Sequence, residues 1–147
     1  MNTRRYLALA GAVALLAPGV MLAQRGPGGA RIGRVINDCA ARTGDFKVSL
    51  RRALNRSRLD GTAREDQLNR DAERLDRSMQ RVAEAWNADH DARRTRAHVS
   101  RAIEVSQDIN RTMVRRRLHP DVQRQWSVVR AELNRLAEVF DLPRIRW

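Results

Sequence analysis

The chain has 147 residues, with 29 lysines and arginines against 17 aspartates and glutamates, so its formal net charge at pH 7 is +12. A chain of this length forms one domain with one hydrophobic core, which excludes an architecture of two full-sized domains. Its single cysteine, Cys39, excludes an intramolecular disulfide.

Residues 1–23 have the layout of a secretory signal peptide. Arg4 and Arg5 precede an apolar run over residues 7–17, and a Pro-Gly break and Ala23 follow. The apolar run is shorter than the roughly 20 residues that a membrane-spanning helix needs. We therefore expect cleavage near Ala23, a periplasmic or secreted location, and no transmembrane span in the mature chain.

Four stretches of helical periodicity follow a flexible linker that we expect over residues 24–31. In each stretch, apolar residues alternate at spacings of three and four, which places them on one side of an α-helix. The four series begin at Ile32, Leu68, Val99 and Val122 and end at Ala53, Trp86, Met113 and Phe140. The pattern predicts an all-α fold, an antiparallel up-down-up-down four-helix bundle over residues 32–147.

Local signals mark the expected ends of these helices. Thr62 and Glu65 have the spacing of a capping box, and Pro120 suits a first helical position with His119 as the cap. Extending the second series past Trp86 would bury charged side chains, which predicts a turn at about residues 87–91. In that turn, left-handed backbone is expected at Asn87, and a cap for the next helix is expected from Asp89 or Asp91.

Two further positions are expected to contribute to the core. Cys39 lies on the apolar stripe of the first helix, which predicts a buried thiol. The segment after the fourth helix leaves it at the end of the bundle that holds Trp86. We expect Ile145 or Trp147 to cover the core at that end.

The sequence contains no recognisable motif for catalysis, a metal or a cofactor. It has neither the Cys-x-x-Cys-His motif of haem attachment nor the Glu-x-x-His spacing of metal sites in bundles. His90 and His119 fall in predicted turns, and Met79 and Met113 fall at core positions. No serine lies in a strained turn flanked by glycines. We therefore expect no enzymatic activity and no bound cofactor.

The basic residues are almost all arginine, since Lys47 is the only lysine. Guanidinium groups suit phosphates, sulfates and carboxylates, although a GC-rich coding sequence would produce the same bias. The third helix is expected to carry a basic outer face, and the arginines at its end also stabilise a helix C-terminus. The candidate anion-binding residues are Arg93, Arg94, Arg101, Arg111, Arg115, Arg116 and Arg117.

Two functions from different classes agree with these observations. The first is a non-enzymatic exported domain that binds an anionic polymer, a lipid headgroup surface or an acidic protein, without sequence-specific recognition of nucleic acid. The alternative is a periplasmic, stress-related holdase chaperone or scaffold. It predicts one connected patch of exposed apolar side chains, for instance from Val48, Leu118, Ile145 or Trp147.

The stretch LHPDVQRQWSVVRAELNRLAEVFDLP resembles the closing segment of small, uncharacterised secreted bacterial helical proteins. The residues that carry the resemblance are Gln123, Trp126, Leu133, Asn134, Leu136, Ala137, Phe140 and Leu142. The resemblance implies a helical fold and export. A weaker likeness is to Spy-like periplasmic chaperones, whose Leu-Thr-x-x-Gln motif corresponds here to residues 118–123, without the threonine and with one residue more.

Overall fold

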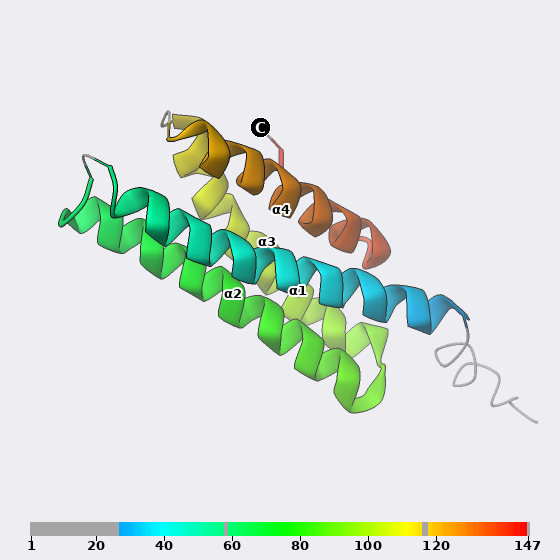
Figure 1. Cartoon of the computed structure of the whole chain (residues 1–147). Helices are drawn as coiled ribbons and strands as arrows, with labels where there is room; N and C mark the ends of the chain where they lie inside the picture. The colour runs from blue at the N-terminus through cyan, green and yellow to red at the C-terminus, as the bar shows by residue number, and fades with distance from the viewer. Residues whose placement is uncertain (1–26, 58, 116–117, 147) are drawn as a thin grey trace, which may run out of the picture.

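The computed structural model describes residues 27–57, 59–115 and 118–146, and the structural statements below concern these residues. Four helices lie side by side, and no strand occurs in the described part of the chain (Figure 1). They are α1 (Pro27–Leu54), α2 (Ala63–Asp89), α3 (Ala92–Arg115) and α4 (Pro120–Val139). The predicted all-α class and its four helices are therefore confirmed. The predicted signal peptide, residues 1–23, lies outside the described residues.

The first helix begins earlier than the sequence pattern predicted. The flexible linker expected over 24–31 is wrong for residues 27–31, which are helical, so the bundle begins at Pro27. Proline is well tolerated in the first turn of a helix, where its missing N–H would have no partner. Ile32 and Val35 pack against the core and hold this part of α1 in place.

One hydrophobic core joins all four helices. The predicted series on α2, α3 and α4 are buried at every position, and on α1 only the two end positions, Ile32 and Ala53, are half-buried. Two of the buried positions are polar, and their hydroxyl groups donate within their own helices, Thr43 to the Cys39 carbonyl and Ser106 to the Ile103 carbonyl. These hydrogen bonds offset the cost of burying a polar group.

Contacts between α1 and α2 run along most of both helices. A Cβ atom placed on Gly33 would lie 3.1 Å from Trp86 Nε1, so glycine permits close approach there. Further along, Cys39 Sγ lies 3.9 Å from Met79 Sδ, and Lys47 Nζ lies 2.5 Å from Asp76 Oδ2. None of the described helices is long and apolar enough to cross a lipid bilayer.

The predicted cap of α2 is present in a shifted form. The Thr62 hydroxyl accepts a hydrogen bond from the Glu65 N–H at 3.2 Å, as predicted. The Glu65 carboxylate accepts from the N–H of Gly61 at 2.7 Å, one residue before the partner that a standard capping box uses. Gly61 has a φ of 72°, a conformation that glycine adopts without strain.

The turn between α2 and α3 falls where it was predicted, with a different residue in the left-handed conformation. Asn87 is still helical, and His90 has a φ of 57° while its N–H donates to the Trp86 carbonyl. The Asp91 carboxylate accepts from the N–H groups of Arg93 and Arg94, which confirms Asp91 as the cap of α3. At the start of α4, His119 Nδ1 accepts from the Asp121 N–H at 3.3 Å, and Pro120 is the first helical residue, as predicted.

The segment after α4 covers a different part of the core from the one expected. It turns back at Asp141, whose φ is 51°. Ile145 is 5% exposed, so its predicted burial is confirmed. However, the next residue, Arg146, accepts a hydrogen bond through its carbonyl from Asn110, and Asn110 also accepts one from Trp126. The Ile145 backbone exchanges hydrogen bonds with Asn134, so the segment runs back along α4 and Ile145 covers the core away from the Trp86 end, where it was predicted to lie; that prediction is wrong. Trp147 is outside the described residues.

The cap of α2 generates a stability prediction. Replacing Thr62 with alanine removes the oxygen that accepts from the Glu65 N–H, so the free energy of unfolding should fall by about 1 kcal/mol. Chemical denaturation followed by circular dichroism measures the change. The Thr62→Ser variant keeps the hydroxyl and should retain most of the stability. Equal losses in the two variants would show that the hydroxyl is not the stabilising group.

Candidate functional site

The arginines predicted to bind anions on α3 are largely neutralised by their own helix or its cap. Arg101 Nη1 lies 3.1 Å from Glu104, and Arg111 forms an ion pair with Asp108. Arg94 Nη1 lies 2.9 Å from Asp89 Oδ2. A hydrogen bond from the Asp91 N–H, with a further contribution from Arg94, lowers the pKa of Asp89. These three arginines already have carboxylate partners.

Arg93 and Arg115 are exposed, and no described carboxylate lies within ion-pair distance of either. They stand at opposite ends of α3, roughly 33 Å apart along the helix at 1.5 Å per residue. The structure therefore does not bring them together into one site. The other two predicted residues, Arg116 and Arg117, lie outside the described chain.

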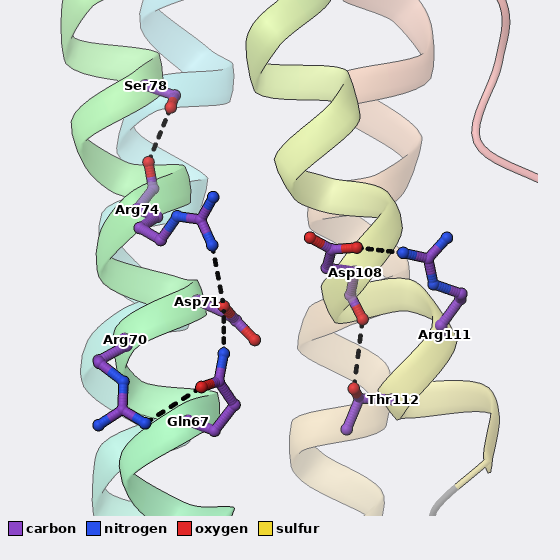
Figure 2. A network of polar contacts seen from close by, with 8 residues as sticks. All are labelled: Gln67, Arg70, Asp71, Arg74, Ser78, Asp108, Arg111 and Thr112. Atoms are coloured by element: carbon purple, nitrogen blue, oxygen red, sulfur yellow. Dashed lines mark hydrogen bonds and ion pairs between the residues drawn. The ribbon is translucent and has the colours of Figure 1, made fainter.

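Figure 2 shows this local pairing on the neighbouring faces of α2 and α3. On α2, Arg70 donates to Gln67, while Gln67 and Arg74 both contact the Asp71 carboxylate. On α3, the Arg111–Asp108 pair stays within its own helix. The polar contacts drawn run along each helix and do not cross between them. This surface is charged, but much of its charge is internally balanced.

A groove between the end of α1 and the start of α4 has a different charge balance. It has a volume of about 790 Å³, and we call it the α1–α4 groove. Arg52, in the last turn of α1, and Arg56, two residues beyond its end, line it from the α1 side, and His119 and Arg124 line it from the α4 side. Ala53 and Val122 supply apolar surface within it. Asp121 also lines the groove, which thus combines basic side chains, one carboxylate and an apolar component.

The arginines on the α1 side of this groove lack acidic partners. Arg52 and Arg56 are exposed, and no carboxylate of the described residues lies within ion-pair distance of them. Across the groove, Arg124 is paired with Asp121, and His119 Nδ1 lies 3.4 Å from the same carboxylate. The α1 side therefore offers two guanidinium groups to an external anion.

A smaller hollow of about 200 Å³ lies between the start of α2 and the end of α3. Arg64 and Arg115 line it together with Gln67, Leu68 and Thr112. Neither arginine has an ion-pair partner in the described chain. Ser57, which lines the α1–α4 groove, and Arg64, which lines this hollow, lie on either side of the connection between α1 and α2.

The unpaired arginines at the end of α1 and just beyond it could not be predicted from stripes of residues on single helices. A groove between two helices arises only when the end of one is set beside the start of another. One signal was nevertheless available. Residues 48–59 contain four arginines, at positions 51, 52, 56 and 58, and no acidic residue. Neither Arg51 nor Arg52 has an acidic residue three or four positions away that could neutralise it on a helix.

The potential metal ligands and nucleophiles are arranged as structural residues. No group of three or more histidine, cysteine or acidic side chains suited to a metal ion occurs in the described parts of the chain. His90 ends α2 with its ring centroid 5.3 Å from that of Trp86, and His119 caps α4. Cys39 is fully buried, as predicted. Burial, assisted by the negative charge of Glu132, raises the pKa of the Cys39 thiol to about 12.

Comparison with known proteins finds no relative of this chain. No protein-family model matches it, and no curated protein or solved structure matches it. The residues and their arrangement are therefore the support for a function.

The environment of Cys39 generates a reactivity prediction. In the folded protein the thiol should react with a thiol-specific reagent at pH 8 at least about a hundredfold more slowly than in guanidinium chloride, because burial suppresses the thiolate and blocks access. Spectrophotometric labelling measures both rates. Since folding raises this pKa, the stabilising contribution of the neutral thiol should be complete below about pH 9 and decline as the pH rises toward 12. Rapid labelling of the folded chain at pH 8 would contradict the buried placement.

Proposed function

We propose that this protein is an exported, non-enzymatic helical domain that binds an anionic partner through the α1–α4 groove. One observation carries the proposal: Arg52 and Arg56 face a large groove without a carboxylate partner among the described residues. Guanidinium groups bind phosphate, sulfate and carboxylate through two parallel hydrogen bonds. Two of them that line one groove can hold successive charges on one anionic chain.

The overall charge supports an acidic polymer, an anionic lipid surface or an acidic protein as the partner. Removing Arg4 and Arg5 with the predicted signal peptide leaves 27 basic against 17 acidic residues, a net charge of +10. Such an excess attracts polyanions over distances of about 10 Å at moderate ionic strength. Arg64, Arg93 and Arg115 contribute to this charge from outside the groove.

The proposal includes export and an up-down-up-down topology. The layout of residues 1–23 supports export. The contacts support alternating helix directions, because residue numbers that rise along α1 pair with numbers that fall along α2, from Gly33 with Trp86 to Lys47 with Asp76. Short connections between helices of similar length favour the same arrangement.

The alternative holdase function has less support from the described residues. Of the apolar residues named for its patch, Ile145 is buried, while Val48 and Leu118 are half-buried. The large apolar side chains that are exposed in the described chain are Val114, Val128 and Val139, and they are divided between α3 and α4. These observations favour the anionic partner.

The groove generates a binding prediction. The Arg52→Gln/Arg56→Gln variant should elute from heparin at lower salt than the wild type, and the slope of log affinity against log salt should become shallower by about one to two units. Heparin is the probe because it is a polyanion with sulfate and carboxylate groups. Retention across a salt series, with circular dichroism to confirm folding, measures the effect.

Two variants with the same change of charge serve as controls. Arg31 and Arg34 are exposed near the start of α1 and have no described ion-pair partner, so Arg31→Gln/Arg34→Gln removes two charges elsewhere on the same helix. Arg93→Gln/Arg115→Gln tests the surface of α3. Equal losses in all three variants would show that net charge alone drives binding and would overturn the groove as the site. Vesicles containing anionic lipid, assayed with the same variants, distinguish a lipid surface from a soluble polymer.

A further inference from the structure

The segment after α4, residues 142–146, bridges α3 and α4, and we call it the tail segment. α3 and α4 contact one another less extensively than the other neighbouring helices do. The tail segment supplies contacts to both, since the Arg146 carbonyl accepts from Asn110 on α3 and the Ile145 backbone contacts Asn134 on α4. These two helices therefore share an irregular backbone segment as a common partner.

The helices hold the tail segment mainly through its backbone. The Ile145 N–H donates to Asn134 Oδ1 at 2.7 Å, and Asn134 Nδ2 donates to the Ile145 carbonyl at 3.2 Å. Asn110 Nδ2 donates to the Arg146 carbonyl at 2.7 Å. Of the tail side chains, that of Ile145 is buried, that of Leu142 is half-buried, and those of Pro143, Arg144 and Arg146 are exposed. Arg144 also forms an ion pair with Glu138 of α4, so this recognition uses the tail backbone, one branched aliphatic side chain and one exposed ion pair.

The two asparagines are suited to this role by their surroundings. Asparagine is a poor residue for the interior of a helix, where its amide competes with the backbone. Asn110 is 5% exposed, and its Oδ1 accepts from Trp126 Nε1 at 3.0 Å. That bond fixes the amide so that its Nδ2 is directed to the tail segment. The Asn110 amide that binds the tail backbone is therefore oriented by Trp126 of α4.

The tail segment also has space on both sides and a fixed point of attachment. A hollow of about 270 Å³ lies beside it against Gln107 and Asn110, and another of about 390 Å³ lies beside it against Arg130 and Asn134. Arg96 donates to the carbonyls of Phe140 and Asp141 at 2.9 Å each, which ties down the end of α4. The Leu142 N–H also donates to the Ala137 carbonyl at 2.8 Å, so the helix end is held through Leu142, and residues beyond Leu142 can leave the bundle without disturbing that end.

We propose that Asn110, Asn134 and the apolar seat of Ile145 form a peptide-binding site, which the tail segment occupies within its own chain. Its external ligand is an extended peptide with one branched aliphatic side chain, which competes with the tail segment for the same hydrogen bonds. The attached segment has a high effective concentration, on the order of millimolar, so it acts as a built-in competitor. This site is separate from the α1–α4 groove and does not depend on anion binding.

The test uses the full chain and a fluorescent peptide, LPRIR with blocked ends, which corresponds to residues 142–146. The Ile145→Asp variant removes the buried anchor from the attached segment, so it should bind the peptide at least about tenfold more tightly than the wild type does. Adding Asn134→Ala should weaken that binding at least about tenfold, because two hydrogen bonds are lost. Adding Asn37→Ala instead, on the exposed face of α1, should leave it unchanged. The same peptide with aspartate in place of isoleucine should not bind.

A second measurement on the wild-type chain covers the case in which Ile145→Asp fails to fold. Unlabelled peptide in excess over the effective concentration of the attached segment should speed hydrogen exchange at the Ile145 amide by displacing it from Asn134. Unchanged exchange, or no peptide binding by a folded Ile145→Asp variant, would overturn the proposal. A concentration-dependent dimer that Ile145→Asp abolishes would also overturn it, since the occupant would then be a second copy of the chain.

Discussion

The mutual burial of four narrow apolar stripes is the constraint on which the rest of this structure depends. Each helix has one such stripe, and all four meet in a single core that includes Trp126 and Leu75. Because these stripes face each other, the charged residues lie on the outer faces of the helices. Their ion pairs form mostly between residues of the same helix. Buried polar positions such as Thr43 and Ser106 are compatible with the core because each donates back to its own helix.

The fold was predictable to the extent that it depends on periodicity and helix caps. The period of the apolar residues located the four helices, and the caps at Thr62 and Pro120 followed from local chemistry. The left-handed residue between α2 and α3 was not predictable in the same way, because His90 takes that position where its ring can contact Trp86. The tail segment has no periodicity, so its path depends on two asparagines whose role appears only in three dimensions.

The candidate site was less predictable than the fold for a related reason. The partners of Arg101 and Arg111 lie three residues away on the same helix, and their pairing can be anticipated from spacing. The α1–α4 groove instead joins side chains about seventy positions apart, such as Arg52 and Arg124. Helical periodicity carries no information on such neighbours. The acid-free run around Arg52 was visible in the sequence, but the surface opposite it was not.

The sole lysine of the chain forms the one described ion pair that joins residues far apart in sequence, Lys47 with Asp76. The other described pairs join residues at most six positions apart, most of them three or four apart on one helix. Short-range pairs can also form in helices that have not yet met a neighbour, so they favour nascent helix in the denatured ensemble. They give no preference for one helix partner over another. The choice of partners during folding is therefore left to the shapes of the apolar stripes and to a few fixed contacts such as the one that Lys47 makes.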